Sequence, residues 1–390
     1  MSWEQRLIAY MVAPPGAGAL PRPADWAAID HAARAHRLRP LLHARAAAID
    51  GAPPPAMRRA WAIDYLREQR HGAAIARSVA QIAALLTGAD VPHAFLKGVH
   101  LAWDTYPDPA QRAMRDIDLL INPDAVIAAR DRLLAAGYLP APFGQKTDDY
   151  AMTQAKHLAP LIAPGTGVTV ELHHMLTDPA AELGTTIRFD ETPALLARVQ
   201  HIDVGGMPVA VLPNDELLLH ILYHAVYDHF FSNGPQVIAD ACFLVQRHDI
   251  HWPRFWAKAE SRSMAAGVGL VLGICARTAQ LPIEIPLAWR PGDAAMMHAM
   301  TVMMRDNYAD RVARSVSDLA RSRAPRAILS AVRSKFTNQA VIAQNNAHLA
   351  AAATPSPVQR SRWSAVGDVL RHVMHQQRHD TALRKLLKDR

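Results

Sequence analysis

Short apolar runs between residues 86 and 176 interrupt a chain whose apolar residues otherwise recur at helical spacing. The runs are of strand length and lie at 91–96, 116–121, 157–163 and 168–173. The last two flank the tetrapeptide PGTG, which predicts a β-hairpin with a four-residue loop. The sequence therefore predicts an α+β fold in which a small mixed-sheet core is flanked by N-terminal and C-terminal helical regions.

Turn-forming residues and changes of pattern divide the chain into four segments. The first 87 residues are rich in Ala and Arg with Pro-rich breaks, and their last long helix is predicted to end at Gly88. After residue 212 helix dominates again, with Asn214 as a predicted N-cap and another helix from about Gln236. We expect a helical region at 1–87, a core at 88–211, a helical domain at 212–353 and a basic helical tail at 354–390.

Composition and the lengths of apolar runs exclude several classes of protein. No uncharged apolar run approaches the roughly 18 residues of a membrane span, so no transmembrane helix and no membrane partner are expected. The first residues lack a basic start followed by an apolar stretch, which predicts no secretory signal and a cytoplasmic protein. The 2 cysteines, Cys242 and Cys275, are too few for a disulfide framework or a four-thiolate zinc site.

The net charge of +7 is concentrated near the C-terminus. Residues 311–390 carry 15 Lys and Arg against 4 Asp and Glu, whereas the preceding residues carry an acidic excess. Such a basic segment could contact nucleic acid, nucleotide phosphate or an acidic partner. It could equally be an Arg-rich helical face that contacts only water, and the sequence leaves these alternatives open.

Two carboxylates on one predicted strand are the strongest chemical signal in the sequence. Asp116 and Asp118 are two residues apart in the run DIDLLI, so in a strand both side chains point to the same face. Neighbouring carboxylates repel each other unless a cation lies between them, and their oxygens suit Mg²⁺, which also binds water and phosphate. Asp-x-Asp is also a frequent tripeptide, and most copies bind no metal.

A third carboxylate and three basic residues could complete a phosphate-handling site. Glu171 lies on the second strand of the predicted hairpin, and if that strand packs beside 116–121 the three carboxylates could hold two metal ions. Two ions can clamp the attacking and leaving oxygens of an in-line phosphoryl displacement. Lys97, Arg112 and Arg115 flank the motif and could stabilise the phosphates, although Arg115 alternates to the opposite strand face and could form a structural ion pair instead.

The segment 96–123 resembles the nucleotidyltransferase fold of the DNA polymerase β superfamily. More narrowly, it resembles a bacterial family of uncharacterised nucleotidyltransferases, which shows Leu-Lys-Gly, then a Tyr, then an Arg shortly before Asp-x-Asp and an apolar run. That family also shows an acidic residue followed by Leu-His, as at 171–173, and a later helix with paired His, as at 217–229. The resemblance covers roughly residues 25–260 and is most specific at 96–123.

The resemblance implies roles for individual residues. Gly98 matches the glycine of a turn whose backbone meets the triphosphate. Asp116 and Asp118 match the two metal-binding carboxylates. Glu171 matches the third carboxylate, which binds the catalytic metal and can help to deprotonate the acceptor hydroxyl.

Two positions depart from the superfamily pattern. Val99 stands where a Gly or Ser usually follows Gly98, so the phosphate contact of a Ser hydroxyl is missing, and Lys97 could supply part of it. The third carboxylate is Glu171 rather than an Asp, which moves the charge outward by one methylene. Both departures leave the identity of the nucleotide open.

Histidines are the last group of candidates. His173 shares the strand face of Glu171 and could approach the metals or the acceptor. His220, His224 and Asp228 are spaced four apart and would line one stripe of a helix. That stripe could bind zinc, line the active site or serve structure alone.

The sequence predicts an enzyme that uses Mg²⁺, or Mn²⁺, to transfer a nucleoside monophosphate from a nucleoside triphosphate to an acceptor hydroxyl, releasing pyrophosphate. The acceptor is expected to be a small molecule, peptide or protein. One alternative is an RNA-modifying or toxin-like relative that holds tRNA through its basic C-terminal region. The other is a relative that binds a nucleotide or partner without catalysis.

Overall fold

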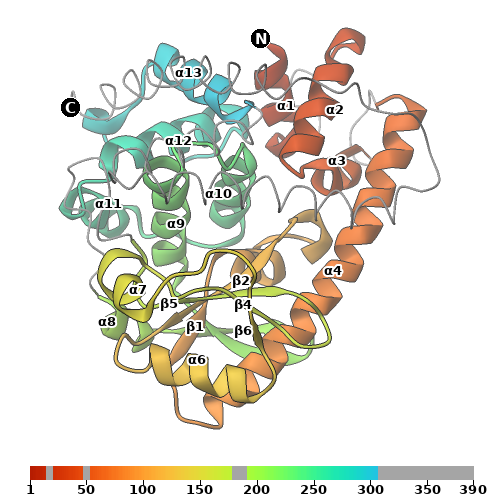
Figure 1. Ribbon diagram of the computed structural model, residues 1–390. Helices are drawn as coiled ribbons and strands as arrows, with labels where there is room; N and C mark the ends of the chain where they lie inside the picture. The colour runs from red at the N-terminus through yellow and green to blue at the C-terminus, as the bar shows by residue number, and fades with distance from the viewer. Residues whose placement is uncertain (15–20, 47–52, 178–190, 306–390) are drawn as a thin grey trace, which may run out of the picture. The chain divides into compact units, whose positions relative to one another are not determined.

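A seven-stranded mixed sheet lies in the lower half of the view in Figure 1, below helices α9, α10 and α12. The computed structural model describes residues 1–14, 21–46, 53–177 and 191–305. The strands are β1 (His93–Phe95), β2 (Asp116–Ile121), β3 (Leu139–Pro140), β4 (Leu161–Ile162), β5 (Thr169–His173), β6 (Gln200–Val204) and β7 (Met207–Val211). They run in the order β3-β4-β5-β2-β1-β7-β6, which confirms the predicted α+β class with a mixed sheet.

Strand β2 is central and has two unlike faces. It pairs antiparallel with β1 and parallel with β5. Ile117, Leu119 and Ile121 point into the main hydrophobic core, which places Asp116 and Asp118 on the opposite face. Burying alternate aliphatic residues thus orients both carboxylates toward one side of the sheet.

The predicted hairpin is confirmed at β4 and β5. The two strands pair antiparallel, and the Ala163 N–H donates to the Val168 carbonyl at 2.8 Å. Gly165 and Gly167 in the connecting loop both have φ of +70°, a backbone conformation that glycine adopts without strain. Val170 and Leu172 of β5 enter the core, so Glu171 takes the same face as the β2 carboxylates.

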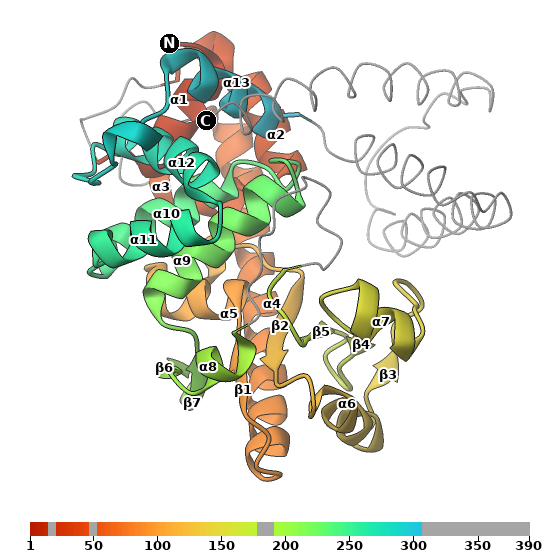
Figure 2. The same cartoon turned by 90° about the vertical axis from the view of Figure 1, so that its left-hand side faces the viewer.

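The long helix α4 (Pro55–Thr87) joins the N-terminal helices to the sheet (Figure 2). It ends before Gly88, as predicted, and Ile75, Val79 and Ile82 of its C-terminal half enter the core under the sheet. Helix α6 (Val126–Ala135) covers the same face, contributing Val126 and Leu133.

Three N-terminal helices pack near the other end of α4. They are α1 (Trp3–Val12), α2 (Trp26–Ala35), which follows the 3₁₀ turn η1 (Pro23–Asp25), and α3 (Arg39–Ala46). Asp30 of α2 connects α3 and α4, because it accepts two hydrogen bonds from Arg39, at 2.9 and 2.7 Å, and one from Trp61 Nε1 at 2.7 Å.

Within the described residues, five short helices or helical turns connect the strands of the sheet. They are α5 (Lys97–His100), the π-helix η2 (Leu101–Thr105), the 3₁₀ turn η3 (Pro109–Gln111), α7 (Asp148–Gln154) and α8 (Thr192–Leu196). The C-terminal helices follow: α9 (Asn214–Tyr223), the π-helix η4 (His224–Asp228), α10 (Gln236–Arg247), α11 (Trp252–Ser261), α12 (Ala265–Thr278), the 3₁₀ turn η5 (Leu287–Trp289) and α13 (Asp293–Met303).

The start of α9 differs from the predicted cap. Pro213 occupies the N-cap position and Asn214 is already helical, so the prediction of Asn214 as N-cap is wrong by one residue. Its Oδ1 instead accepts a hydrogen bond from Gln200 Nε2 at 3.0 Å. Glu216, in the first turn of α9, is fully buried and forms ion pairs with Lys258 at 2.6 Å and Arg262 at 2.9 Å.

The structure bears on the expected absence of membrane-spanning helices but not on the basic C-terminal segment. Among the described helices, none is both long enough and apolar enough to cross a membrane. The basic segment 311–390, and with it the tail predicted at 354–390, lies outside the described residues. The domain limits predicted at 87, 211 and 353 stay predictions.

Candidate active site

Parallel pairing of β2 and β5 brings the three predicted carboxylates together. The register sets Asp118 directly opposite Glu171, while Asp116 lies one pair further along, opposite Thr169. Directly paired residues project to the same side of a sheet, so all three carboxylates share one face. Asp118 is buried at 7% exposure, and Asp116 and Glu171 are half-buried.

Asp118 is held by two partners. The Lys97 Nζ lies 3.3 Å from Asp118 Oδ2, and the His173 Nε2 lies 2.9 Å from Asp118 Oδ1. Burial by itself would raise the pKa of Asp118, but the Lys97 ammonium and the His173 hydrogen bond outweigh it and hold that pKa well below its usual value. Asp118 is therefore ionised at neutral pH.

Asp116 has no such compensation. Burial, and then the negative charges of Asp118 and Glu171, raise the pKa of Asp116 to about 7, against the opposing effect of Lys97. Three carboxylates thus crowd a region that holds one close ammonium group. A divalent cation would relieve this repulsion.

Glu171 interacts with two imidazoles. Its Oε2 lies 3.6 Å from His173 Nε2 and 3.7 Å from His157 Nε2. Burial would raise the pKa of Glu171, but the His173 hydrogen bond helps to lower it below the usual value. Burial and the nearby His173 lower the pKa of His157 to about 4, so His157 is neutral at pH 7.

His157 is a site residue that the sequence analysis missed. It forms an isolated antiparallel bridge with His173, and the two rings lie 5.0 Å apart between centroids. The signal was present, because 157–163 was predicted to pair with 168–173, and that hairpin sets the first residue of one run against the last of the other.

One group of side chains in the described part of the chain has the spacing of metal ligands. It comprises Asp118, Glu171 and His173, each of which offers a ligand atom within 4.8 Å of the others. Asp116 is absent from this group, although it faces the same side of β2. The predicted roles of Asp116, Asp118 and Glu171 as catalytic metal ligands stay predictions.

Lys97 and Gly98 form the connection from β1 into α5. Lys97 has a φ of +38°, a left-handed conformation that costs a non-glycine residue on the order of 1–3 kcal/mol. That conformation accompanies the contact of its buried side chain with Asp118. A Cβ at Gly98 would lie 3.1 Å from both Arg112 Nη1 and Met114 Sδ, so an added side chain would press on these two side chains.

Arg112 is occupied by a partner far along the chain. Its Nε and Nη2 donate to the two carboxylate oxygens of Asp240, both at 2.9 Å, and Tyr106 donates to the same carboxylate at 2.7 Å. This buried pair joins the core to α10. The predicted contact with phosphate would fall to Nη1, the nitrogen next to Gly98, and it remains a prediction. Arg115 is exposed.

The helical histidines lie beside the site but form no metal group of their own. His224 Nδ1 lies 3.1 Å from Asp228 Oδ2, and Lys156 donates to that same oxygen. Burial, and next the Lys97 charge, hold the pKa of both His220 and His224 well below the usual value. Since the described residues hold only the Asp118, Glu171 and His173 group as a candidate metal cluster, the zinc hypothesis for this stripe finds no support.

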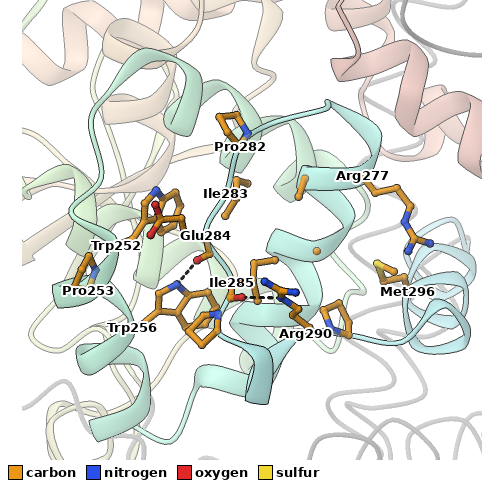
Figure 3. Close-up of a pocket in the computed structure, with 14 residues that line it drawn as sticks. Trp252, Pro253, Trp256, Arg277, Pro282, Ile283, Glu284, Ile285, Arg290 and Met296 are labelled. Carbon is orange, nitrogen blue, oxygen red and sulfur yellow. Dashed lines mark hydrogen bonds between the residues drawn. The ribbon is translucent and has the colours of Figure 1, made fainter.

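A separate groove of about 1060 Å³ lies among the C-terminal helices (Figure 3). Trp252 and Trp256 of α11 line one side, and the segment 282–286 crosses it, with Trp256 Nε1 donating to the Glu284 carbonyl at 2.7 Å. The groove contains none of the predicted site residues.

Comparison with known proteins agrees with the geometry of the β2–β5 site. A search of curated proteins gives no match for this chain. The model of a family described as "Uncharacterised nucleotidyltransferase" matches residues 22–280. This match covers more than half of the chain and includes every carboxylate, lysine and histidine of the site described above. The chain therefore belongs to the uncharacterised nucleotidyltransferase family.

Proposed function

We propose that this protein transfers a nucleoside monophosphate from a nucleoside triphosphate to a hydroxyl group of a small molecule, peptide or protein. Membership of a nucleotidyltransferase family supports nucleotidyl transfer in general. The observation that carries the finer proposal is the parallel register of β2 and β5, which assembles Asp116, Asp118 and Glu171 on one face beside Lys97.

The residues present fit a divalent metal. When ionised, the three carboxylates exceed the one ammonium group in contact with them, that of Lys97, by two negative charges, which suits a divalent cation. The raised pKa of Asp116 supports the same conclusion, because it arises from uncompensated neighbouring charge as well as burial. Asp116, Asp118 and Glu171 would hold the metal, which when bound polarises the phosphate and stabilises charge on the leaving group.

The protein's own groups account for the remaining steps. The acceptor hydroxyl oxygen attacks the α-phosphorus, the new O–P bond forms, and the bond to the β-phosphate oxygen breaks to release pyrophosphate. Glu171, ionised and half-buried, takes the hydroxyl proton. Lys97 keeps Asp118 oriented, and the backbone at Gly98, next to Lys97, would approach the triphosphate.

Labelled nucleotides test this proposal. The protein is incubated with Mg²⁺ and cell extract, using each NTP labelled either at the α- or at the γ-phosphate. We expect a labelled acceptor from α-label only, with loss of the signal in Asp118→Asn and retention in the matched variant Asp124→Asn, whose carboxylate is exposed and outside the site.

The outcome also identifies the acceptor class. Label in the small-molecule, peptide or protein fraction supports the proposal, and label in tRNA favours the RNA-modifying alternative. Transfer of the γ-label, or undiminished transfer by Asp118→Asn, contradicts the proposed chemistry.

A further inference from the structure

The candidate metal ligands in the described chain are two carboxylates and one imidazole. Asp118 Oδ1 lies 2.9 Å and Glu171 Oε2 lies 3.6 Å from the same atom, His173 Nε2. Adjacent ligand atoms around an ion with bonds of about 2.1 Å are roughly 3 Å apart. The three atoms are therefore spaced as neighbouring ligands of a single ion, with His173 Nε2 between the two oxygens.

The Nδ1 atom of His173 makes no bond in the described residues that would fix the protonation of Nε2. His173 is fully buried, and its Nδ1 has no hydrogen-bond partner within the described residues. The tautomer of a histidine is usually fixed by the bond that its other nitrogen makes. Here no such bond fixes it, so Nε2 can present either a proton to Asp118 or a lone pair to a metal.

Lys97 does not take the place of this ion. Its Nζ contacts Oδ2 of Asp118, whereas the oxygen beside His173 Nε2 is Oδ1. Neither His157 Nε2, at 3.7 Å from Glu171, nor the helical histidines belong to the ligand group. The cluster thus offers one nitrogen and two oxygens, and leaves the remaining positions to Asp116, water or substrate.

We propose that Asp118, Glu171 and His173 form a mixed nitrogen and oxygen site that selects Mn²⁺ over Mg²⁺ through direct coordination by His173 Nε2. Imidazole is a poor ligand for Mg²⁺, which prefers oxygen, whereas Mn²⁺, although it also favours oxygen, is a transition ion that tolerates a nitrogen ligand beside carboxylates. The inference rests on the proposed function, since it names the metal of that site, and it adds a histidine nitrogen to the carboxylate ligands proposed there.

Pulsed electron paramagnetic resonance of bound Mn²⁺ tests the coordination directly. A nitrogen ligand couples to the unpaired electrons of the ion and modulates the spin echo, without any need for turnover. We expect nitrogen coupling in the full-length protein, its loss in His173→Gln and its retention in His157→Gln. Glutamine keeps a polar group of similar reach and can offer an oxygen in place of the imidazole nitrogen. His157→Gln is the matched control, because it removes a neighbouring imidazole that lies outside the ligand group.

Binding isotherms supply the second readout. His173→Gln is expected to weaken Mn²⁺ binding by about 100-fold and Mg²⁺ binding by less than about tenfold. Absence of nitrogen coupling in the wild-type protein, its persistence in His173→Gln, or equal losses of Mn²⁺ and Mg²⁺ affinity would each overturn the inference. Thermal unfolding of both variants shows whether they are folded.

The two proposals fail in different ways. If α-label is transferred normally while nitrogen coupling is absent, His173 is only a hydrogen-bond donor to Asp118 and nucleotidyl transfer stands. If coupling is present and no acceptor is ever labelled, the metal site stands and the transfer chemistry is refuted.

Discussion

The buried Arg112–Asp240 pair gives the sharpest stability prediction. Its two hydrogen bonds are both 2.9 Å, the side chains are only 11% and 7% exposed, and Tyr106 adds a third bond to the carboxylate. Asp240→Ala would leave the buried Arg112 guanidinium and the buried Tyr106 hydroxyl without their hydrogen-bond acceptor. Removing one partner of a buried ion pair costs about 3–5 kcal/mol, and we expect a loss of unfolding free energy in that range.

A double-mutant cycle measured by urea unfolding isolates the pair. Arg112→Met leaves the Asp240 carboxylate uncompensated and should cost a similar amount, whereas the double variant Arg112→Met with Asp240→Ala buries no unpaired charge. The coupling between the two sites should therefore be at least about 2 kcal/mol. Additive losses, or single losses under about 1 kcal/mol, would refute the structural role assigned to Arg112. A collapse of activity in Arg112→Lys with unchanged stability would instead favour the predicted phosphate contact.

Three further predictions follow from other contacts. Glu216→Gln should lower the urea midpoint at pH 7, because it weakens the bonds to Lys258 and Arg262. Burial raises the pKa of Glu216 in the wild-type protein, but these two partners outweigh burial and hold that pKa below its usual value. The loss of stability should therefore persist above pH about 4.3 and shrink as pH falls through the folded-state pKa of Glu216. Gly98→Ala should reduce transfer and destabilise by about 1–3 kcal/mol, because its Cβ would lie 3.1 Å from Arg112 and Met114, and a normal melting temperature with full activity would contradict the contact. Mn²⁺ at about 100 times its Kd should raise stability by about 2.7 kcal/mol, reversibly with chelator, and Asp118→Asn should abolish the shift seen by thermal unfolding.

Local pattern was sufficient for the strands that carry the site. The alternation in DIDLLI predicted that Asp116 and Asp118 share a face, and the PGTG loop predicted the β4–β5 hairpin. The parallel alignment of β2 with β5 could be stated only as a condition, because α6, β3, α7 and β4 separate these two strands along the chain. Register between distant strands depends on the whole core, which no local window contains.

Residues whose partners lie far away were harder to interpret. Arg112 stands next to the motif in sequence and was predicted to reach phosphate, yet the partner that holds it, Asp240, is 128 residues downstream. The paired histidines of α9 and η4 have the spacing of zinc ligands, but Asp228 is bound by Lys156 from another segment. In both cases a charge supplied by tertiary packing determines what the side chain does.

Helix α4 has a consequence for how this protein can be divided. Its 33 residues extend about 50 Å, with Trp61 bound to Asp30 of α2 and Ile75, Val79 and Ile82 buried beneath the sheet. A recombinant fragment that begins at residue 88 would keep every carboxylate of the site and lose the cover of the sheet, exposing aliphatic surface to solvent and to aggregation. The smallest soluble fragment that keeps the site should therefore start before Pro55 and carry the whole helix. Sequence limits drawn around a motif are thus poor guides to where this chain can be cut.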